Sequence, residues 1–299
     1  MNRKNARTAV WLASWLLPLM TAGCMVQVSS CGGSWLTIGE HSISEQDGKL
    51  VVDDVLLPYE RWVEVELAAP GAGRLEVETA LGPVELQGAA QESCRLSARV
   101  HSEREGDGQV SIEGGRLVAT SQQGGKVFLD AVKGSVPEAL GLKIVTGTGD
   151  VSVERVAKGG PLAIDTGTGE ITVRESEPAS LTIETGTAAV RLERGGAARV
   201  RVDSGAGDVL VVDGTWGTIQ VEGGTTDCTL QGATAETVIL DSGTGTLRLQ
   251  GCTVGRAKLD SGTGDLVISG GSCQRADLDS GTGDIELLDG ARVESQTSN

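Results

Sequence analysis

Aromatic side chains are scarce in this chain of 299 residues. One Phe, one Tyr and five Trp amount to 2% of the sequence. A wide protein core is filled to crystal-like density, and aromatic rings normally supply much of that volume. The shortage argues against a broad core and favours a narrow interior lined by Val, Leu, Ile and Ala.

Catalytic motifs are missing as well. The sequence has only two histidines, His41 and His101, and it contains no HExxH, GxSxG or Walker motif. Paired carboxylates can cleave carbohydrates, but the carboxylates of this chain are repeated, whereas catalysis needs one distinct constellation. We therefore expect no enzymatic activity, and a carbohydrate-active enzyme is the less favoured alternative.

No stretch is long and apolar enough to span a bilayer comfortably. The apolar segment TAVWLASWLLPLM follows three basic residues, Arg3, Lys4 and Arg7, and precedes TAGC, which ends at Cys24. This order resembles a bacterial lipoprotein signal. The resemblance implies that residues 1–23 are a signal peptide, that Cys24 carries the lipid, and that the protein is exported and attached to a membrane of the bacterial cell envelope. Lipidation at Cys31, plain secretion and a retained anchor helix remain alternatives.

Basic residues are outnumbered by acidic ones. Without residues 1–23 the chain has 22 basic and 41 acidic side chains, a net charge of −19. Such a surface repels nucleic acid and anionic lipid head groups, so we expect no nucleic-acid partner. Five cysteines remain besides Cys24, and no pair has the CxxC spacing of a metal or redox motif. Export permits disulfides among them, but the sequence does not indicate which residues pair.

A glycine-rich acidic corner, such as LDSGTGD at residues 259–265, recurs at a nearly fixed interval. If the first Ser or Thr of each corner is taken as an anchor, the anchors are 20 residues apart once and then 19 apart six times. The eight anchor positions are Thr146, Thr166, Thr185, Ser204, Gly223, Ser242, Ser261 and Ser280. A ninth, degenerate copy has its anchor at Thr79. Internal repeats of this length indicate a stacked architecture.

The residues that flank each anchor alternate in polarity. The positions four and two before the anchor, and five and seven after it, are apolar in every copy, for example Val238, Leu240, Leu247 and Leu249. A period of two with one apolar face predicts two short strands per coil. One unit cannot bury that face, but stacked units can. We therefore predict an all-β fold, a single parallel β-solenoid of 19-residue coils. An antiparallel sandwich with the corners as hairpin loops is the alternative.

The residue after each anchor is Gly in all eight copies, and a second Gly follows two residues later in six of them. This uniformity predicts a corner that needs positive φ or a close approach between stacked backbones. The 223 coil departs from the pattern, with GGTTDC in place of SGTGD. Its neighbour Trp216 is either a sugar-stacking platform or, as we favour, a packing residue.

Acidic residues stand next to the corners on both sides. Stacking would place like charges about 5 Å apart. In the favoured interpretation they are solvated and cap backbone N–H groups; in the alternative they bind Ca²⁺ through oxygen ligands. The candidate cation-binding residues are Asp203, Asp208, Asp241, Asp260, Asp265, Asp279 and Asp284.

The repeats also suggest domain boundaries. We expect a tether over residues 24–40, an N-terminal β cap over 41–73, the β-solenoid over 74–291 and a disordered tail over 292–299. Residues 87–141 are strand-like but irregular.

Two strings, AAPGAGRLEVETALGPVEL and VPEALGLKIVTGTGDV, together with the later TGTGD and SGTGD corners, cover roughly residues 60–290. They resemble the bacterial putative-adhesin family of β-strand-repeat proteins, whose function is unknown. The resemblance implies a β-solenoid that is exported or membrane-attached, and it transfers no catalytic residue. We expect a lipid-anchored, non-catalytic adhesion or scaffold module that binds an envelope protein or a polysaccharide. A purely structural envelope protein with no specific ligand is the alternative.

Overall fold

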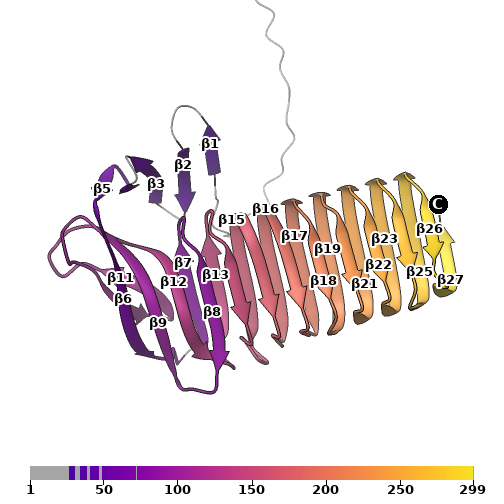
Figure 1. Cartoon of the computed structure of the whole chain (residues 1–299), viewed down its shortest axis with the longest axis horizontal. Helices are drawn as coiled ribbons and strands as arrows, with labels where there is room; N and C mark the ends of the chain where they lie inside the picture. The colour runs from indigo at the N-terminus through magenta and orange to yellow at the C-terminus, as the bar shows by residue number, and fades with distance from the viewer. Residues whose placement is uncertain (1–26, 31–33, 39–40, 47–48, 72, 299) are drawn as a thin grey trace, which may run out of the picture.

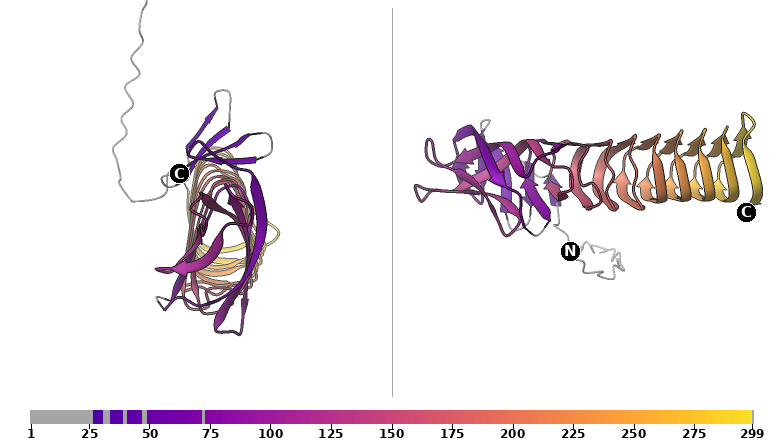
Figure 2. Two further views of the ribbon diagram at one scale, coloured as in Figure 1. Left: turned by 90° about the vertical axis from the view of Figure 1, so that its left-hand side faces the viewer. Right: turned by 90° about the horizontal axis from the view of Figure 1, so that it is seen from below.

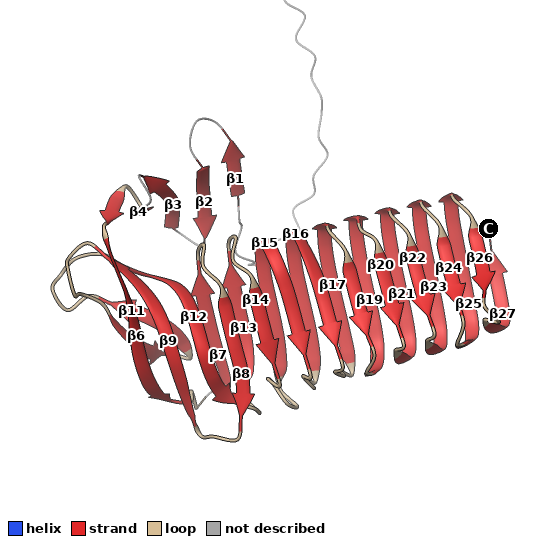
Figure 3. Ribbon diagram, in the orientation of Figure 1, coloured by secondary structure: helices blue, strands red, loops and turns tan. Residues whose placement is uncertain are grey.

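The computed structural model describes residues 27–298, apart from residues 31–33, 39–40, 47–48 and 72 (Figure 1). These described residues form strands and loops without a helix (Figure 3), so none of them belongs to a helix that could cross a membrane. The expected signal peptide, residues 1–23, and the expected lipidation site Cys24 lie outside the described residues.

Two long parallel ladders run along the molecule and build a solenoid. The first ladder contains β7 (Arg74–Thr79), β13 (Gly141–Thr146), β15 (Pro161–Arg174), β16 (Ser180–Glu193), β17 (Arg199–Ala206), β19 (Thr215–Thr225), β21 (Thr234–Thr244), β23 (Thr253–Thr263), β25 (Ser272–Thr282) and β27 (Arg292–Ser298). The second contains β8 (Val84–Ala89), β14 (Val151–Glu154), the C-terminal halves of β15 and β16, β18 (Val209–Val212), β20 (Cys228–Gln231), β22 (Leu247–Gln250), β24 (Leu266–Ser269) and β26 (Ile285–Leu288). Viewed along the axis, the coils superimpose as a flattened ring (Figure 2).

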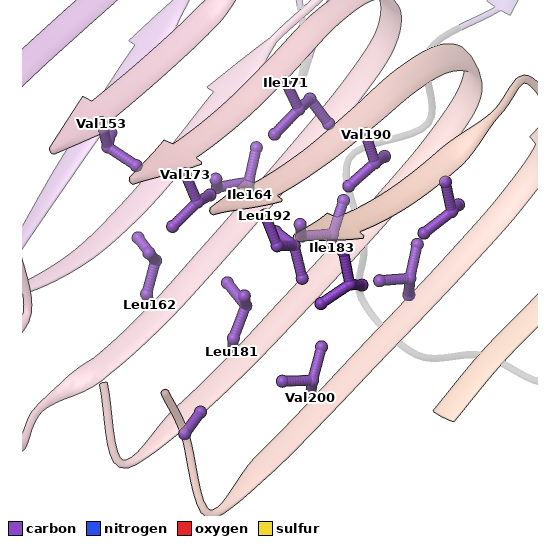
Figure 4. Close-up of a cluster of buried hydrophobic side chains, with 14 of the residues drawn as sticks. Val153, Leu162, Ile164, Ile171, Val173, Leu181, Ile183, Val190, Leu192 and Val200 are labelled. Atoms are coloured by element: carbon purple, nitrogen blue, oxygen red, sulfur yellow. The ribbon is translucent and has the colours of Figure 1, made fainter. Parts of the chain in front are cut away.

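The interior of the solenoid is a file of aliphatic side chains, as predicted. Leu259 is the register partner of both Leu240 and Leu278, and the three side chains are at most 1% exposed. The same alternation holds in earlier coils, where residues such as Ile164 and Ile183 point inward between the two ladders (Figure 4). The parallel β-solenoid with 19-residue spacing is therefore confirmed.

A third inward-facing column was not predicted. From β19 to β25 the first strand of each coil begins eight residues before the anchor, and its second residue is buried. This column contains Trp216, Ala235, Val254 and Cys273, which are register partners on successive coils. Their volumes and polarities differ too much to show as an aliphatic repeat.

The degenerate copy at Thr79 is the first coil of the stack. Thr79 in β7 is paired in register with Thr146 in β13, although 67 residues separate them in the sequence. The intervening chain leaves the solenoid as β9 (Ser93–Ser102), β10 (Gln109–Glu113), β11 (Arg116–Thr120) and β12 (Val127–Pro137). β9 pairs antiparallel with both β12 and β6 (Tyr59–Ala68), β10 pairs antiparallel with β11, and β12 rejoins the stack parallel to β8. These strands cover the N-terminal end of the solenoid (Figure 1).

A separate five-stranded antiparallel sheet precedes this covering layer. It consists of β1 (Gln27–Ser30), β2 (Ser34–Ile38), β3 (His41–Gln46), β4 (Lys49–Val52) and β5 (Val55–Leu57). Two of its strands thus lie in the segment expected to be a tether. Ile43, Val52 and Leu57 of this sheet pack with Ala80 of the first coil, so the sheet lies beside the stack.

The C-terminal segment differs from expectation. Residues 292–298, expected as a disordered tail, form β27, which pairs in parallel with β25 from Ser272↔Arg292 onward. The unpaired edge of β25 offers backbone donors and acceptors one coil spacing away, and the chain continues the ladder there despite its polar composition.

The glycine of each corner is required by stacking. Gly262, which follows its anchor, is outside the positive-φ region, and a Cβ there would lie 2.8 Å from the carbonyl oxygen of Gly243. The second glycine combines both constraints in four of its six copies. Gly264, for example, has φ +152°, and a Cβ there would lie 2.1 Å from the Gly245 oxygen. Of the two explanations predicted for the first glycine, close backbone stacking is correct, and positive φ belongs to the second.

Candidate functional site

One column of carboxylates precedes the anchors on the outer surface of the first ladder. Its members are register partners on successive coils: Asp165, Glu184, Asp203, Glu222, Asp241, Asp260 and Asp279. Basic neighbours offset part of the repulsion, since Arg201 Nη2 lies 3.0 Å from Glu222 Oε2 and Lys258 Nζ lies 3.5 Å from Asp260 Oδ2. Burial raises the pKa of Asp165, and the Glu184 carboxylate raises it further.

A second column follows the anchors and caps backbone groups. Asp227 Oδ1 accepts a hydrogen bond of 2.7 Å from the Thr246 N–H, and Asp265 Oδ1 accepts one of 3.0 Å from the Asp284 N–H. Each bond joins one coil to the next at the corner. These aspartates therefore act as the caps of the favoured interpretation.

The structure divides the candidate cation-binding residues between these two columns. Asp203, Asp241, Asp260 and Asp279 belong to the first, while Asp208, Asp265 and Asp284 belong to the second. Over the described ranges, no group of three or more His, Cys, Asp or Glu side chains is arranged to hold a metal ion. Calcium binding remains a prediction.

The cysteines within the described ranges are interior residues. Cys94, Cys228, Cys252 and Cys273 are buried free thiols. Burial raises the pKa of each thiol, which suppresses the reactive thiolate. They serve as small apolar side chains of the core.

Trp216 is a packing residue. Its side chain is 3% exposed, and its Nε1 donates a hydrogen bond of 3.0 Å to the Asp213 carbonyl. No face of the indole is open to a sugar, so the stacking alternative for this residue is wrong.

A polar groove lies on the covering layer at the other end of the molecule. Its floor is the outer face of five adjacent strands in the order β14, β8, β12, β9 and β6, and its volume is about 860 Å³. Alternate residues of these strands point into it: Glu64, Glu66, Glu85, Gln87, Arg95, Ser97, Lys133, Ser135, Ser152 and Glu154. The opposite residues, such as Val65 and Leu86, pack against the core.

Hydrogen bonds hold several of the groove side chains in place. Glu64 accepts a bond of 2.6 Å from Ser97 Oγ, and Glu66 accepts bonds from Ser93 Oγ at 2.7 Å and Arg95 Nε at 3.2 Å. The bond from Ser93, followed by the bond and charge of Arg95, lowers the pKa of Glu66. The Glu66 carboxylate therefore stays ionised over the physiological range.

An exposed indole stands beside this groove. Trp62 shares the outer face of β6 with Glu64 and Glu66, and 43% of the residue is exposed. The Lys133 ammonium lies 4.6 Å from the centre of its ring, and the Arg99 guanidinium lies 5.9 Å away. These cation–π contacts fix the ring over β9 and β12 and leave part of its surface accessible.

A buried ionic cluster joins this layer to the first coil. Asp130 in β12 is 2% exposed, forms an ion pair with Arg99, and accepts hydrogen bonds from the Leu81 and Gly82 N–H groups of the first coil. His101 Nε2 lies 3.4 Å from the same carboxylate. Burial acts to raise the pKa of Asp130, but His101 and Arg99 outweigh it and lower the pKa.

Sequence reasoning did not find this groove. Three of its floor strands, β6, β9 and β12, belong to no repeat, and only the fold brings Trp62 near Lys133. The one signal in the sequence was an isolated Trp in an alternating strand, residues 59–68.

Comparisons with known proteins found similarity to one family model and to solved structures. Residues 213–294 match the family described as Toastrack DUF4097. Among solved structures, the chain matches a putative cell adhesion protein from Clostridium sporogenes ATCC 15579 at 10% identity, over 79% of this chain and 100% of that chain, with a TM-score of 0.18. No curated protein matches the sequence. Residues 213–294, the C-terminal coils of the β-solenoid, are therefore similar to the Toastrack DUF4097 family.

Proposed function

We propose that the protein is an exported, lipid-anchored β-solenoid that acts as a non-catalytic adhesion or scaffold module at the bacterial cell envelope. One observation carries this proposal. The outer faces of the solenoid present the same side-chain types in register on successive coils, as the seven carboxylates of the first acidic column do.

Such faces suit contact with an extended partner. Equivalent groups recur about every 4.8 Å along the axis. Individually weak contacts along a repeated surface add up through multivalency. The similarity of residues 213–294 to the Toastrack DUF4097 family lies on the repeated coils and supports the same proposal.

The net charge of the molecule limits the chemical classes of partner that it can bind. The chain has 41 acidic and 25 basic residues, so polyanions such as nucleic acid are repelled. An envelope protein with a basic surface or an uncharged polysaccharide fits better.

Saturable binding to isolated envelopes tests the adhesion proposal. The mature chain, beginning at Cys24 but without lipid, is titrated against envelope fragments, and bound protein is measured after sedimentation. We expect saturable binding that excess unlabelled protein competes away. Binding no greater than that of an unrelated acidic protein would favour the purely structural alternative.

Lipid attachment is tested separately. Metabolic labelling with a fatty acid should mark the full-length protein and should be lost in Cys24→Ser. Cys31→Ser is the matched control and should keep the label. Loss of the label in Cys31→Ser alone would move the anchor to that residue.

A further inference from the structure

We propose that the groove on β6, β9, β12, β8 and β14 binds an uncharged polysaccharide chain, with Trp62 stacked against one sugar ring. This inference rests on the proposed adhesion function and names the class of ligand. It places a sugar-binding surface on the covering layer, in addition to the repeated faces of the solenoid.

The shape of the groove fits a short stretch of a polymer. Its volume of about 860 Å³ lies within the range of ligand sites in proteins. The floor crosses five strands, so a ligand that lies across them can contact side chains of each strand.

The chemistry of the floor fits hydroxyl groups. Gln87 and Ser152 offer neutral donors and acceptors, and the Ser135 hydroxyl is held by the Gln91 amide. Glu64 and Glu66 are held by the hydrogen bonds of Ser97, Ser93 and Arg95. Side chains fixed in this way lose little further conformational entropy when a ligand binds. Sugar hydroxyls both donate and accept, and they can therefore use carboxylate, amide and hydroxyl partners at once.

The charge of the floor excludes polyanionic polysaccharides. Four carboxylates, Glu64, Glu66, Glu85 and Glu154, face only two cations, Arg95 and Lys133. One of these cations already forms an ion pair with Glu66, and the other lies over the Trp62 ring. A uronate or sulfate ligand would find no free cation there.

An extended peptide is a poorer fit than a sugar chain. Peptides usually bind sheets by adding a strand to a free backbone edge. Here β8, β12 and β9 each pair with a strand on both sides. The floor of the groove therefore offers side chains rather than backbone groups.

Trp62 supplies the apolar surface that sugar rings need. One face of a pyranose carries mainly C–H groups, and an accessible indole matches it in size and polarity. Trp62 is 43% exposed and is held against Lys133, a residue of the groove. The ring is thus positioned before any ligand arrives.

Affinity electrophoresis tests the proposal. The mature chain is run through native gels that contain hydroxyethyl cellulose, xyloglucan, galactomannan or polygalacturonate. We expect at least one of the three neutral polymers to slow the protein, and we expect no retardation by polygalacturonate. Retardation by none of the neutral polymers, or by polygalacturonate alone, would overturn the proposal.

Substitutions locate the site. Trp62→Ala should lower the affinity for the retarding polymer by about tenfold, the size expected for loss of one aromatic stacking contact. Tyr59→Ala is the matched control, because Tyr59 is 42% exposed on the opposite side of the same strand. Gln87→Ala, on β8 in the floor, should also weaken binding. Equal binding by wild type, Trp62→Ala and Gln87→Ala would place recognition elsewhere.

Envelope binding separates this inference from the proposed function. If the neutral polymers retard wild type and Trp62→Ala equally while wild type binds isolated envelopes, the groove assignment is wrong and the adhesion proposal stands. If wild type binds no envelope but is retarded by a neutral polymer, the groove is correct and its biological ligand lies outside the envelope. Matching thermal melts confirm that the variants remain folded.

Discussion

At the scale of single residues, the stack is limited by contacts between successive backbones. At each corner a glycine lies against the carbonyl oxygen of the preceding coil, as Gly262 does against Gly243. The loop on the other side of each coil leaves room for side chains. Its positive-φ position is open, and different coils place Glu175, Asp213 or Gly251 there.

Gly262→Ala should therefore destabilise the solenoid. Its Cβ would lie 2.8 Å from a fixed backbone oxygen, and we expect a loss of about 1–3 kcal/mol in the free energy of unfolding. Thermal melts followed by circular dichroism measure it. Gly251→Asp is the control, since Asp213 adopts a similar φ at the equivalent position, and it should cost less than about 1 kcal/mol. Equal losses in the two variants would contradict the stacking explanation.

In the 223 coil, the side chain that fills the corner comes from a different position of the repeat than in the neighbouring coils. Its anchor is Gly223, and a Cβ there would lie 2.4 Å from Thr226 Oγ1. Thr226 is 1% exposed, and its hydroxyl finds no hydrogen-bond partner among the described residues. The threonine side chain thus fills the volume that Ser occupies in neighbouring coils.

A double-mutant cycle tests this exchange. Gly223→Ser alone should destabilise the protein by clashing with Thr226. Adding Thr226→Gly should restore stability to near the wild-type value, with a coupling energy of about 1–3 kcal/mol. Losses that simply add in the double variant would show that the two positions do not share one space.

At the scale of elements, the strands of the repeat pair with one another in equivalent ways, whereas β12 connects two different parts of the molecule. It joins the covering layer to the first coil through Asp130, which bonds to the Leu81 and Gly82 N–H groups and pairs with Arg99 of β9. One carboxylate therefore ties three segments together.

This junction should be sensitive to acid. The folded protein lowers the pKa of Asp130 below the ordinary value of 3.8, so its contribution to stability is present at neutral pH and is lost as the pH falls below about 4. Asp130→Asn should be less stable than wild type at pH 7, and its melting temperature should fall less between pH 5 and pH 3. Asp277→Asn, at an exposed position, is the control and should follow wild type. Parallel pH curves for Asp130→Asn and wild type would contradict the role of this carboxylate.

The sequence predicted the repeated elements well because each apolar position recurs at a constant spacing. Leu240, Leu259 and Leu278 could be placed in one file from that spacing alone. The covering layer could not be predicted, since β9 to β12 occur once and their pairing depends on contacts far apart in the chain. The groove beside Trp62 depends on those same contacts and was missed for the same reason.

At the scale of the whole molecule, the protein is a rod with different ends. The N-terminal end is closed by antiparallel strands and carries the groove, while the opposite end finishes with β26 and β27 (Figure 1). Leu287, the partner of the inward-facing Ile268, and Leu288, the partner of the outward-facing Ser269, are 42% and 44% exposed at this end. This polarity separates the proposed recognition surface from the repeated acidic faces.

All of these conclusions depend on coils that rise in register along one axis. Thr187, Thr244, Thr263 and Thr282 are exposed members of one register column, and the last three lie three, four and five coils from the first. Each coil should add about 4.8 Å, so the Cα distances from Thr187 should be about 14, 19 and 24 Å. Spin labels are placed at Cys substitutions of these residues in a chain with Cys24 and Cys31 changed to Ser, where the other four thiols are buried.

Double electron–electron resonance on the pairs 187–244, 187–263 and 187–282 then tests the stack most directly. The account predicts distances that increase by about 4.8 Å with each added coil. Distances that alternate, or that fail to rise from one pair to the next, would contradict a solenoid and favour the antiparallel sandwich.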